Sequence, residues 1–276
     1  MGALALDYGA KKRYVDVHIH LYDPLYGSTI EAVLKDAETA GVSAIVICAE
    51  NYKTSLATLQ IARKYSPRTY AAIGIHPSSV SFLDEHELDK TLSLIEQNLS
   101  GIVAIGEVGL DRRLNEGEIN KNQFPVFNEM LRAAESHDLP IIVHSRGSAA
   151  EVLKVLSSYN IPKVLLHWYS GPQDSLQEVI ERGYYVSVGP SILYARYLQD
   201  LVATMPLDHI LTETDGPVPY KGPFKGRLTS PSFIPDVLDT IVRIKQRNAE
   251  EVLSQVFENF QEFFSLNSVH KLSQSL

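Results

Sequence analysis

The feature that most constrains the fold is a regular alternation of short apolar segments with longer segments of helical periodicity. Eight of the short segments have the length of β-strands, and several are apolar on both faces, as parallel strands covered on both sides usually are. The expected strands are Tyr14–His20, Ser43–Cys48, Thr69–Ile75, Ile102–Glu107, Pro140–His144, Lys163–His167, Tyr184–Val188 and His209–Thr212. Such a pattern indicates the α/β class of folds.

Segments with apolar residues three and four positions apart follow the expected strands. These helices are Thr29–Ala40, Thr54–Tyr65, Glu85–Gln97, Phe124–Ser136, Ala149–Ser158, Leu176–Arg182, Leu193–Ala203, Ile234–Gln246 and Glu250–Phe264. An open doubly wound sheet usually has a Gly-rich phosphate loop after an early strand, and this sequence has none. Eight strands therefore favour a (β/α)₈ barrel of the TIM type with an extra C-terminal helix. Because no repeat, low-complexity tract or linker divides the sequence, we expect a single domain spanning residues 1–276.

Composition limits the compartment and the partners of the protein. The net charge of -8 argues against electrostatic wrapping of nucleic acid, so any contact with a polyanion must be local. Cys48 is the only cysteine, which excludes an intrachain disulfide and fits a reducing compartment. The first residues lack the basic start and apolar core of a signal peptide, and no uncharged apolar run approaches ~18 residues. We therefore expect a cytoplasmic protein with no membrane partner and no evident obligate protein partner.

Residue types that bind metals occur at the ends of six expected strands. In the first strand Val15, Val17 and Ile19 alternate with polar residues, which places His18 and His20 on one face. Barrel enzymes place their active sites at these C-terminal strand ends. Six such ends are improbable by chance, because charge and imidazole are costly beside apolar runs. The residues are His18, His20, His76, Glu107, His144, His167 and the triplet Glu213–Asp215.

The sequence resembles the TatD family of metal-dependent deoxyribonucleases, which belongs to the amidohydrolase-like barrels. The resemblance extends from the first strand to the C-terminal helix, where F-E-N-F-Q-E-F-F at 257–264 is similar to the closing helix of the family. It rests on D-V-H-I-H at 16–20, G-I-H-P at 74–77, I-G-E-V-G-L-D at 105–111, L-P-I-I-V-H-S-R at 139–146, L-L-H-W-Y-S-G at 165–171 and L-T-E-T-D-G-P at 211–217.

This resemblance implies a centre of two divalent metal ions. The implied ligands of the first ion are His18, His20, Glu107 and Asp215, and those of the second are Glu107, His144 and His167. A carboxylate has two oxygens, so Glu107 could bridge both ions, as no neutral imidazole can. The mixed ligands suit Zn or Mn, and Mg less well, without deciding among them. Two such ions are the usual device for activating a water and hydrolysing a phosphoester.

The resemblance also implies catalytic roles beyond metal binding. Asp215 would accept the proton of the attacking water, and Glu107 would hold both ions. His76 would contact a phosphate oxygen or protonate the leaving group, although a turn histidine bonded to the backbone fits as well. The residues expected to orient ligands and loops from behind are Asp16, Asp111 and Glu213.

Cationic candidates for substrate contact lie near the expected barrel mouth. Arg146 could pair with phosphate through its planar guanidinium group, or fix its own loop. Lys221, Lys225 and Arg227 form a compact basic patch in the Gly- and Pro-rich loop after Asp215. The N-terminal basic cluster at residues 11–13 precedes the first strand, and we interpret it as a solvated terminus at the other end of the barrel.

Aromatic candidates lie beside expected ligands. Trp168, Tyr169 and Tyr22 could stack on unpaired bases, although rim aromatics more often pack against the protein. The pair Trp168–Tyr169 stands where the family more commonly has Cys-Phe, and L-T-S-P at 228–231 stands where many relatives have Asn-Glu-Pro. Both departures line the expected substrate path and leave the implied ligands intact.

Three classes of function follow. The leading one is a metal-dependent deoxyribonuclease that cleaves phosphodiester bonds of DNA at single-stranded ends, because a barrel mouth admits a splayed strand more easily than a duplex. The alternative is a related hydrolase of a non-DNA ester or amide, such as a small-molecule ester, a cyclic amide or an aminoacyl-tRNA ester. Many of those barrels have a carboxylated lysine on the fourth strand, where this chain has Glu107. A non-catalytic scaffold is the third class, which the intact ligand set disfavours.

Overall fold

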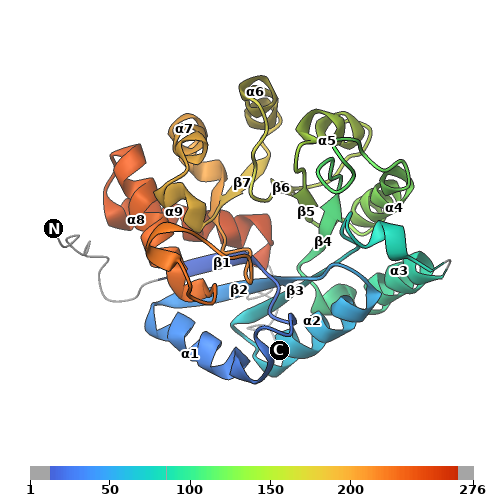
Figure 1. Cartoon of the computed structure of the whole chain (residues 1–276), viewed down its shortest axis with the longest axis horizontal. Coiled ribbons are helices and arrows are strands. Elements are labelled where there is room, and N and C mark those ends of the chain that lie inside the picture. The colour runs from blue at the N-terminus through green and yellow to red at the C-terminus, as the bar shows by residue number, and fades with distance from the viewer. Residues whose placement is uncertain (1–12, 85, 267–276) are drawn as a thin grey trace, which may run out of the picture.

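Eight parallel strands form one sheet in sequential order, and in the computed structural model this sheet curls into a nearly closed barrel (Figure 1). The structure describes residues 13–84 and 86–266, so the expectations for residues 1–12 and for Glu85 lie outside it. The strands are β1 (Tyr14–Ile19), β2 (Val42–Cys48), β3 (Thr69–Ile73), β4 (Ala104–Gly109), β5 (Ile141–His144), β6 (Val164–Leu166), β7 (Tyr185–Val188) and β8 (Ile210–Thr212). The predicted TIM-type barrel is confirmed.

Helices alternate with the strands and surround the barrel (Figure 1). They are α1 (Ile30–Thr39), α2 (Tyr52–Lys64), α3 (Glu87–Gln97), α4 (Gln123–Ser136), α5 (Ala149–Leu156), α6 (Gln173–Glu181), α7 (Arg196–Thr204), α8 (Ile234–Lys245) and α9 (Ala249–Phe263). The predicted helix at 193–203 begins late, because residues 190–193 form a 3₁₀ turn and Ala195 is extended at ψ 105°. The helix predicted from Thr54 begins earlier, because Asn51 and Thr54 cap each other's backbone.

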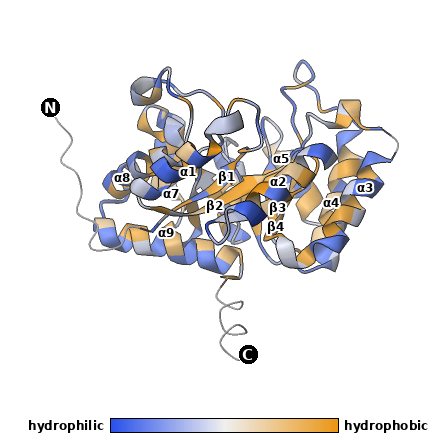
Figure 2. Ribbon diagram, turned by 90° about the horizontal axis from the view of Figure 1, so that it is seen from below, coloured by the Kyte–Doolittle hydropathy of each residue, from blue (hydrophilic) through white to orange (hydrophobic). Residues whose placement is uncertain are grey.

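The strands are buried on both faces. All six residues of β1 and all six of β4 are buried, and Figure 2 shows the strands as the most hydrophobic part of the chain. The surrounding helices contribute one apolar face each, for example Leu198, Leu201 and Val202 of α7. Continuous apolar strands under amphipathic helices explain why the sequence pattern predicted this fold.

The barrel closes where β8 lies beside β1. Asp16, which is fully buried, accepts hydrogen bonds from the backbone N–H of Thr214 at 3.0 Å and from its hydroxyl at 2.5 Å. Two backbone hydrogen bonds continue this contact past the end of β8. The N–H of Asp215 donates to the carbonyl of His18 at 2.8 Å, and the N–H of His20 donates to the carbonyl of Gly216 at 2.8 Å. These bonds hold the end of β1 against the segment that follows β8.

Helix α9 covers the N-terminal end of the barrel (Figure 2). Phe260 contacts Tyr70 near the start of β3, with ring centroids 5.8 Å apart, and Phe263 contacts Tyr185 at the start of β7, at 5.1 Å. The Asn259 amide donates to the carbonyl of Ile210, the first residue of β8, at 2.8 Å. The predicted C-terminal helix is therefore confirmed, and it leaves the opposite end of the barrel accessible. None of the helices in the described part of the chain combines the length and apolar character needed to cross a membrane.

Candidate metal centre

Four histidines and two carboxylates meet at the C-terminal end of the barrel, and all but His144 are buried. They come from the ends of five strands, and the His144 side chain is 13% exposed. The structure thus brings together every residue that the sequence analysis predicted as a ligand: His18, His20, Glu107, His144, His167 and Asp215.

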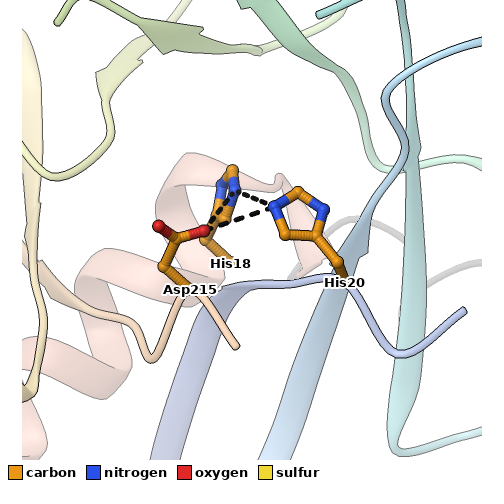
Figure 3. A group of neighbouring side chains, drawn as sticks. All are labelled: His18, His20 and Asp215. Atoms are coloured by element: carbon orange, nitrogen blue, oxygen red, sulfur yellow. Dashed lines mark hydrogen bonds and ion pairs between the residues drawn. The ribbon is translucent and has the colours of Figure 1, made fainter. Parts of the chain in front are cut away.

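The first group lies around one oxygen of Glu107. Its Oε2 is 3.2 Å from Nε2 of His18 and 3.5 Å from Nε2 of His20. Oδ1 of Asp215 is 3.5 Å and 3.2 Å from the same two nitrogens, which are themselves 3.3 Å apart. Figure 3 shows His18, His20 and Asp215 pointing toward one common point.

The second group lies around the other oxygen of the same carboxylate. Oε1 of Glu107 is 2.8 Å from Nδ1 of His144 and 2.7 Å from Nε2 of His167, and these nitrogens are 3.1 Å apart. One side chain therefore faces two sets of donor atoms with its two oxygens.

The hydrogen bonds behind the ligands fix which ring nitrogens face the centre as lone pairs. Nδ1 of His20 is 2.8 Å from the carbonyl of Cys48 and must donate to it, so in the neutral ring Nε2 faces Asp215 as a lone pair. Nε2 of His144 likewise donates to Asp111 at 2.8 Å, which leaves Nδ1 as a lone pair. Lone pairs and carboxylate oxygens that face one another at these distances need a cation between them. The donor set therefore fits divalent metal ions.

The electrostatics of the buried groups agree with this fit. Burial raises the pKa of Glu107, but nearby imidazoles, foremost His76 and His167, act more strongly and hold that pKa well below its usual value. Burial lowers the pKa of His20, but the hydrogen bond to Asp215 and the charge of Glu107 raise it to about 9. A divalent ion would replace that proton between the same atoms.

His76 differs from the predicted ligands in its hydrogen bonding. Its Nδ1 accepts the backbone N–H of Ser78 at 3.1 Å, so Nε2 bears the proton of the neutral ring and points at Oε1 of Glu107 from 3.4 Å. Burial, with the neighbouring imidazole of His144, lowers the pKa of His76 to about 3, although Glu107 opposes this. His76, Glu107 and His144 are close enough to hold an ion, but the inward N–H makes His76 a hydrogen-bond donor.

Of the three carboxylates expected behind the ligands, Asp111 and Glu213 lie beside imidazoles of the centre, whereas Asp16 accepts hydrogen bonds from the backbone of His18 and from Thr214. Asp111 binds His144 and also accepts from Nε of Arg146 at 2.9 Å. Oε2 of Glu213 accepts the Ser187 hydroxyl at 2.6 Å and lies 3.6 Å from Nδ1 of His167. The cluster of Glu213 with His167 and His18 is also compact enough for an ion, but the Ser187 hydroxyl already occupies the Glu213 oxygen nearest His167.

A glycine at the end of β4 allows β4 and β5 to lie very close to each other beside the ligands. Gly109 has a φ of 141°, and a Cβ there would lie 2.0 Å from the carbonyl oxygen of His144. Only a residue without a side chain lets β4 and β5 meet so closely at the ligands.

A pocket of about 330 Å³ opens beside the centre. Of the predicted substrate contacts, Arg146 and Trp168 line it, together with His144, Ser145, His167, Ser170, Tyr197, Asp215 and Val218. Lys221 and Lys225 are exposed on the loop after β8 and do not belong to the lining. The guanidinium of Arg227 lies over the ring of Phe233, 4.5 Å from its centroid.

Two residues near the site were not predicted from the sequence. Tyr197 lines the pocket from α7, where its position depends on how that helix packs. Glu50 follows β2 by two residues, accepts the Tyr22 hydroxyl at 2.8 Å, and lies 3.8 Å from Nδ1 of His76. A carboxylate just after an expected strand was a usable signal for Glu50. Of the other aromatic candidates, Tyr22 is engaged with Glu50, and Tyr169 is completely buried.

Comparison with known sequences gives matches along nearly the whole chain. A family model described as TatD related DNase matches residues 15–265. The chain is 29% identical over 258 residues to the uncharacterized metal-dependent hydrolase YjjV of Escherichia coli, covering 92% of this chain and 98% of that protein. It is 32% identical over 262 residues to deoxyribonuclease TATDN3 of Homo sapiens, covering 91% and 94%.

Solved structures show the same architecture. The crystal structure of YjjV, a TatD homolog from Escherichia coli, has a TM-score of 0.86 at 28% identity, covering 92% of this chain and 98% of that one. A TatD family hydrolase from Entamoeba histolytica has a TM-score of 0.82 at 22% identity, covering 92% and 99%, and supports the fold alone.

Proposed function

This chain belongs to the TatD-related DNase family of metal-dependent hydrolases, and from that premise we propose that it is a deoxyribonuclease cleaving phosphodiester bonds at single-stranded ends of DNA. The observation that supports this most strongly is the position of Glu107, whose two oxygens face two separate groups of ligand atoms. A bridging carboxylate of this kind is suited to two divalent ions acting together on one phosphate.

In this proposal His18, His20, Glu107 and Asp215 hold one ion, and Glu107, His144 and His167 hold the other. When bound, the ions supply Lewis-acid polarisation of the phosphate and a lower pKa for water. The net charge of the chain is -8, so a polyanion is repelled by the protein as a whole. The positive charge of the bound ions would give it a local site of attraction.

The protein's own residues then handle the proton and the phosphate. Asp215 directs Oδ1 at the ligand nitrogens and lines the pocket, which supports a role for its other oxygen in taking the proton of the attacking water. The inward N–H of His76 donates a hydrogen bond to a phosphate oxygen. Arg146, held at Nε by Asp111, presents the rest of its half-exposed guanidinium to the phosphate as the bond to the leaving nucleotide breaks.

The experiment compares labelled single-stranded and duplex oligonucleotides, an aminoacyl-tRNA ester and small chromogenic esters, each with Mg, Mn or Zn added after chelation. We expect release of nucleotides from single-stranded ends, dependent on added metal and absent in Glu107→Gln, because that amide cannot serve two cations. The matched control is Glu118→Gln, which changes an exposed carboxylate and should keep wild-type activity. Ester hydrolysis without cleavage of any oligonucleotide would contradict the proposal and favour a non-DNA substrate.

A further inference from the structure

A tryptophan forms one wall of the pocket beside the centre. Trp168 follows the predicted ligand His167 directly and has a φ of 39°, in the left-handed region that few non-glycine residues adopt. This backbone turn accompanies an indole that remains partly exposed and lines the pocket instead of joining the barrel core.

The indole is supported on its face and at its edge. The ring of Tyr220 packs against it with centroids 5.6 Å apart and planes tilted by 30°, and Tyr220 is itself buried, with its hydroxyl donating to the carbonyl of Thr214 at 2.7 Å. At the edge, Nε1–H of Trp168 donates to the hydroxyl of Tyr197 at 3.3 Å. A large aromatic surface is therefore held in place before any ligand arrives, which reduces the entropic cost of binding.

The pocket combines this aromatic surface with groups suited to an anion. Tyr197 and Val218 add apolar surface to the lining, and Ser145 and Arg146 add a hydroxyl and a guanidinium group. Tyr197 keeps 50% of its surface exposed on α7. A ligand that matches both kinds of group has a flat aromatic ring attached to a phosphate, which is the chemistry of a nucleotide.

We propose that Trp168 and Tyr197 form a stacking subsite for the unpaired base adjacent to the phosphodiester bond that is cleaved. This inference rests on the proposed deoxyribonuclease activity and assigns its preference for an unpaired end to two residues of this chain. A pocket of about 330 Å³ is at the small end of the range for ligand sites and takes a single nucleotide. A paired base would have to leave its duplex before it could stack there.

The kinetic test compares a single-stranded oligonucleotide that has a normal terminal base with one that has an abasic sugar at the same end. The wild type should prefer the terminal base. Trp168→Ala should raise KM for the normal oligonucleotide by about fivefold or more, with kcat changed less, because one stacked base contributes that much binding. The same variant should no longer discriminate between the two oligonucleotides. Trp168→Phe should keep part of the discrimination, and Tyr197→Ala should weaken it.

The matched control is Phe82→Ala, which removes an aromatic ring that is 86% exposed and outside the pocket lining. This variant should keep the wild-type KM and the wild-type preference. Equal KM values for both oligonucleotides in the wild type, or unchanged discrimination in Trp168→Ala, would overturn the stacking subsite.

A second measurement detects the contact between the base and Trp168 without turnover. Trp168 is the only tryptophan of the chain, so the intrinsic tryptophan emission of the Mg-loaded protein, measured with oligonucleotides whose terminal linkage resists hydrolysis, reports on this residue alone. Adding the normal oligonucleotide should quench the emission to saturation, and the abasic oligonucleotide should not. Absent quenching while fluorescence anisotropy of a labelled oligonucleotide shows binding would refute the contact. If the wild type cleaves no DNA, the proposed function fails, and a titration with a mononucleotide still decides whether a base stacks on Trp168.

Discussion

At the scale of single residues, the site is organised around the carboxylate of Glu107. Its oxygens lie 2.7 to 3.2 Å from the nearest nitrogens of His167, His144 and His18, and only 2% of the residue is exposed. A buried charge of this kind is tolerated only when paired, so its partners are as necessary as the charge itself. The hydrogen bonds from outside the cluster then decide which ring nitrogens remain available to a cation.

Asp111 provides a test of the hydrogen bonds that reach the ligands from outside the cluster. Asp111→Asn keeps an oxygen for the N–H of His144 but removes the charge that also pairs with Arg146. We expect metal to remain bound while activity falls by roughly 10–100-fold, the usual cost of altering a group behind a ligand. Steady-state kinetics and elemental analysis of the same preparation measure both quantities. The control is Asp138→Asn. Asp138 is exposed and has a φ of 53°, a conformation that asparagine also adopts, so activity should not change. Loss of the metal together with activity would instead make Asp111 a ligand.

At the scale of elements, parallel strands explain how much of the site could be predicted. The two-residue period placed His18 and His20 on one face, and equivalent strand ends meet at one end of a barrel. Tyr197 could not be predicted, because its place depends on the 3₁₀ turn that delays the start of α7. The stacking of Arg227 on Phe233 depends equally on loop packing, which leaves no periodic signal in the sequence.

The close approach of β4 and β5 leads to a prediction about stability. Gly109→Ala places a methyl group against the carbonyl of His144 and forces the alanine into a φ of 141°. We expect the free energy of unfolding to fall by about 2 kcal/mol or more, because a well-packed interior absorbs added atoms poorly. Metal affinity should fall as well, since His144 is displaced. Chemical denaturation of the metal-free protein measures the first effect. Gly101→Ala, whose nearest neighbour would be the Arg63 guanidinium at 3.9 Å, should cost much less; equal decreases would refute the explanation from close strand packing.

At the scale of the whole molecule, the proposed deoxyribonuclease activity requires an acidic chain to attract a polyanion to one end of its barrel. Lys221 and Lys225 are exposed on the loop after β8 and can supply this attraction. The double variant Lys221→Gln/Lys225→Gln should raise KM for single-stranded DNA. The salt dependence of KM should also become weaker. In a plot of log KM against log salt concentration, the slope should fall by about 0.7 for each phosphate group that the variant no longer neutralises. Arg227 is left unchanged because it packs on Phe233.

The control for this double variant is Lys35→Gln/Lys154→Gln, which removes the same charge from the exposed faces of α1 and α5. It should leave the slope at the wild-type value. Hydrolysis of a small chromogenic phosphodiester should be unaffected by either variant. Identical salt dependence in both double variants would remove the loop after β8 from substrate binding.

We propose that one buried carboxylate, that of Glu107, joins two cation sites at the C-terminal end of the barrel. Anomalous diffraction from crystals of the Mn-loaded protein tests it most directly. We expect two manganese peaks per chain, one beside each oxygen of Glu107, the first also near His18, His20 and Asp215 and the second near His144 and His167. A single peak, or two peaks that do not share Glu107, would contradict it.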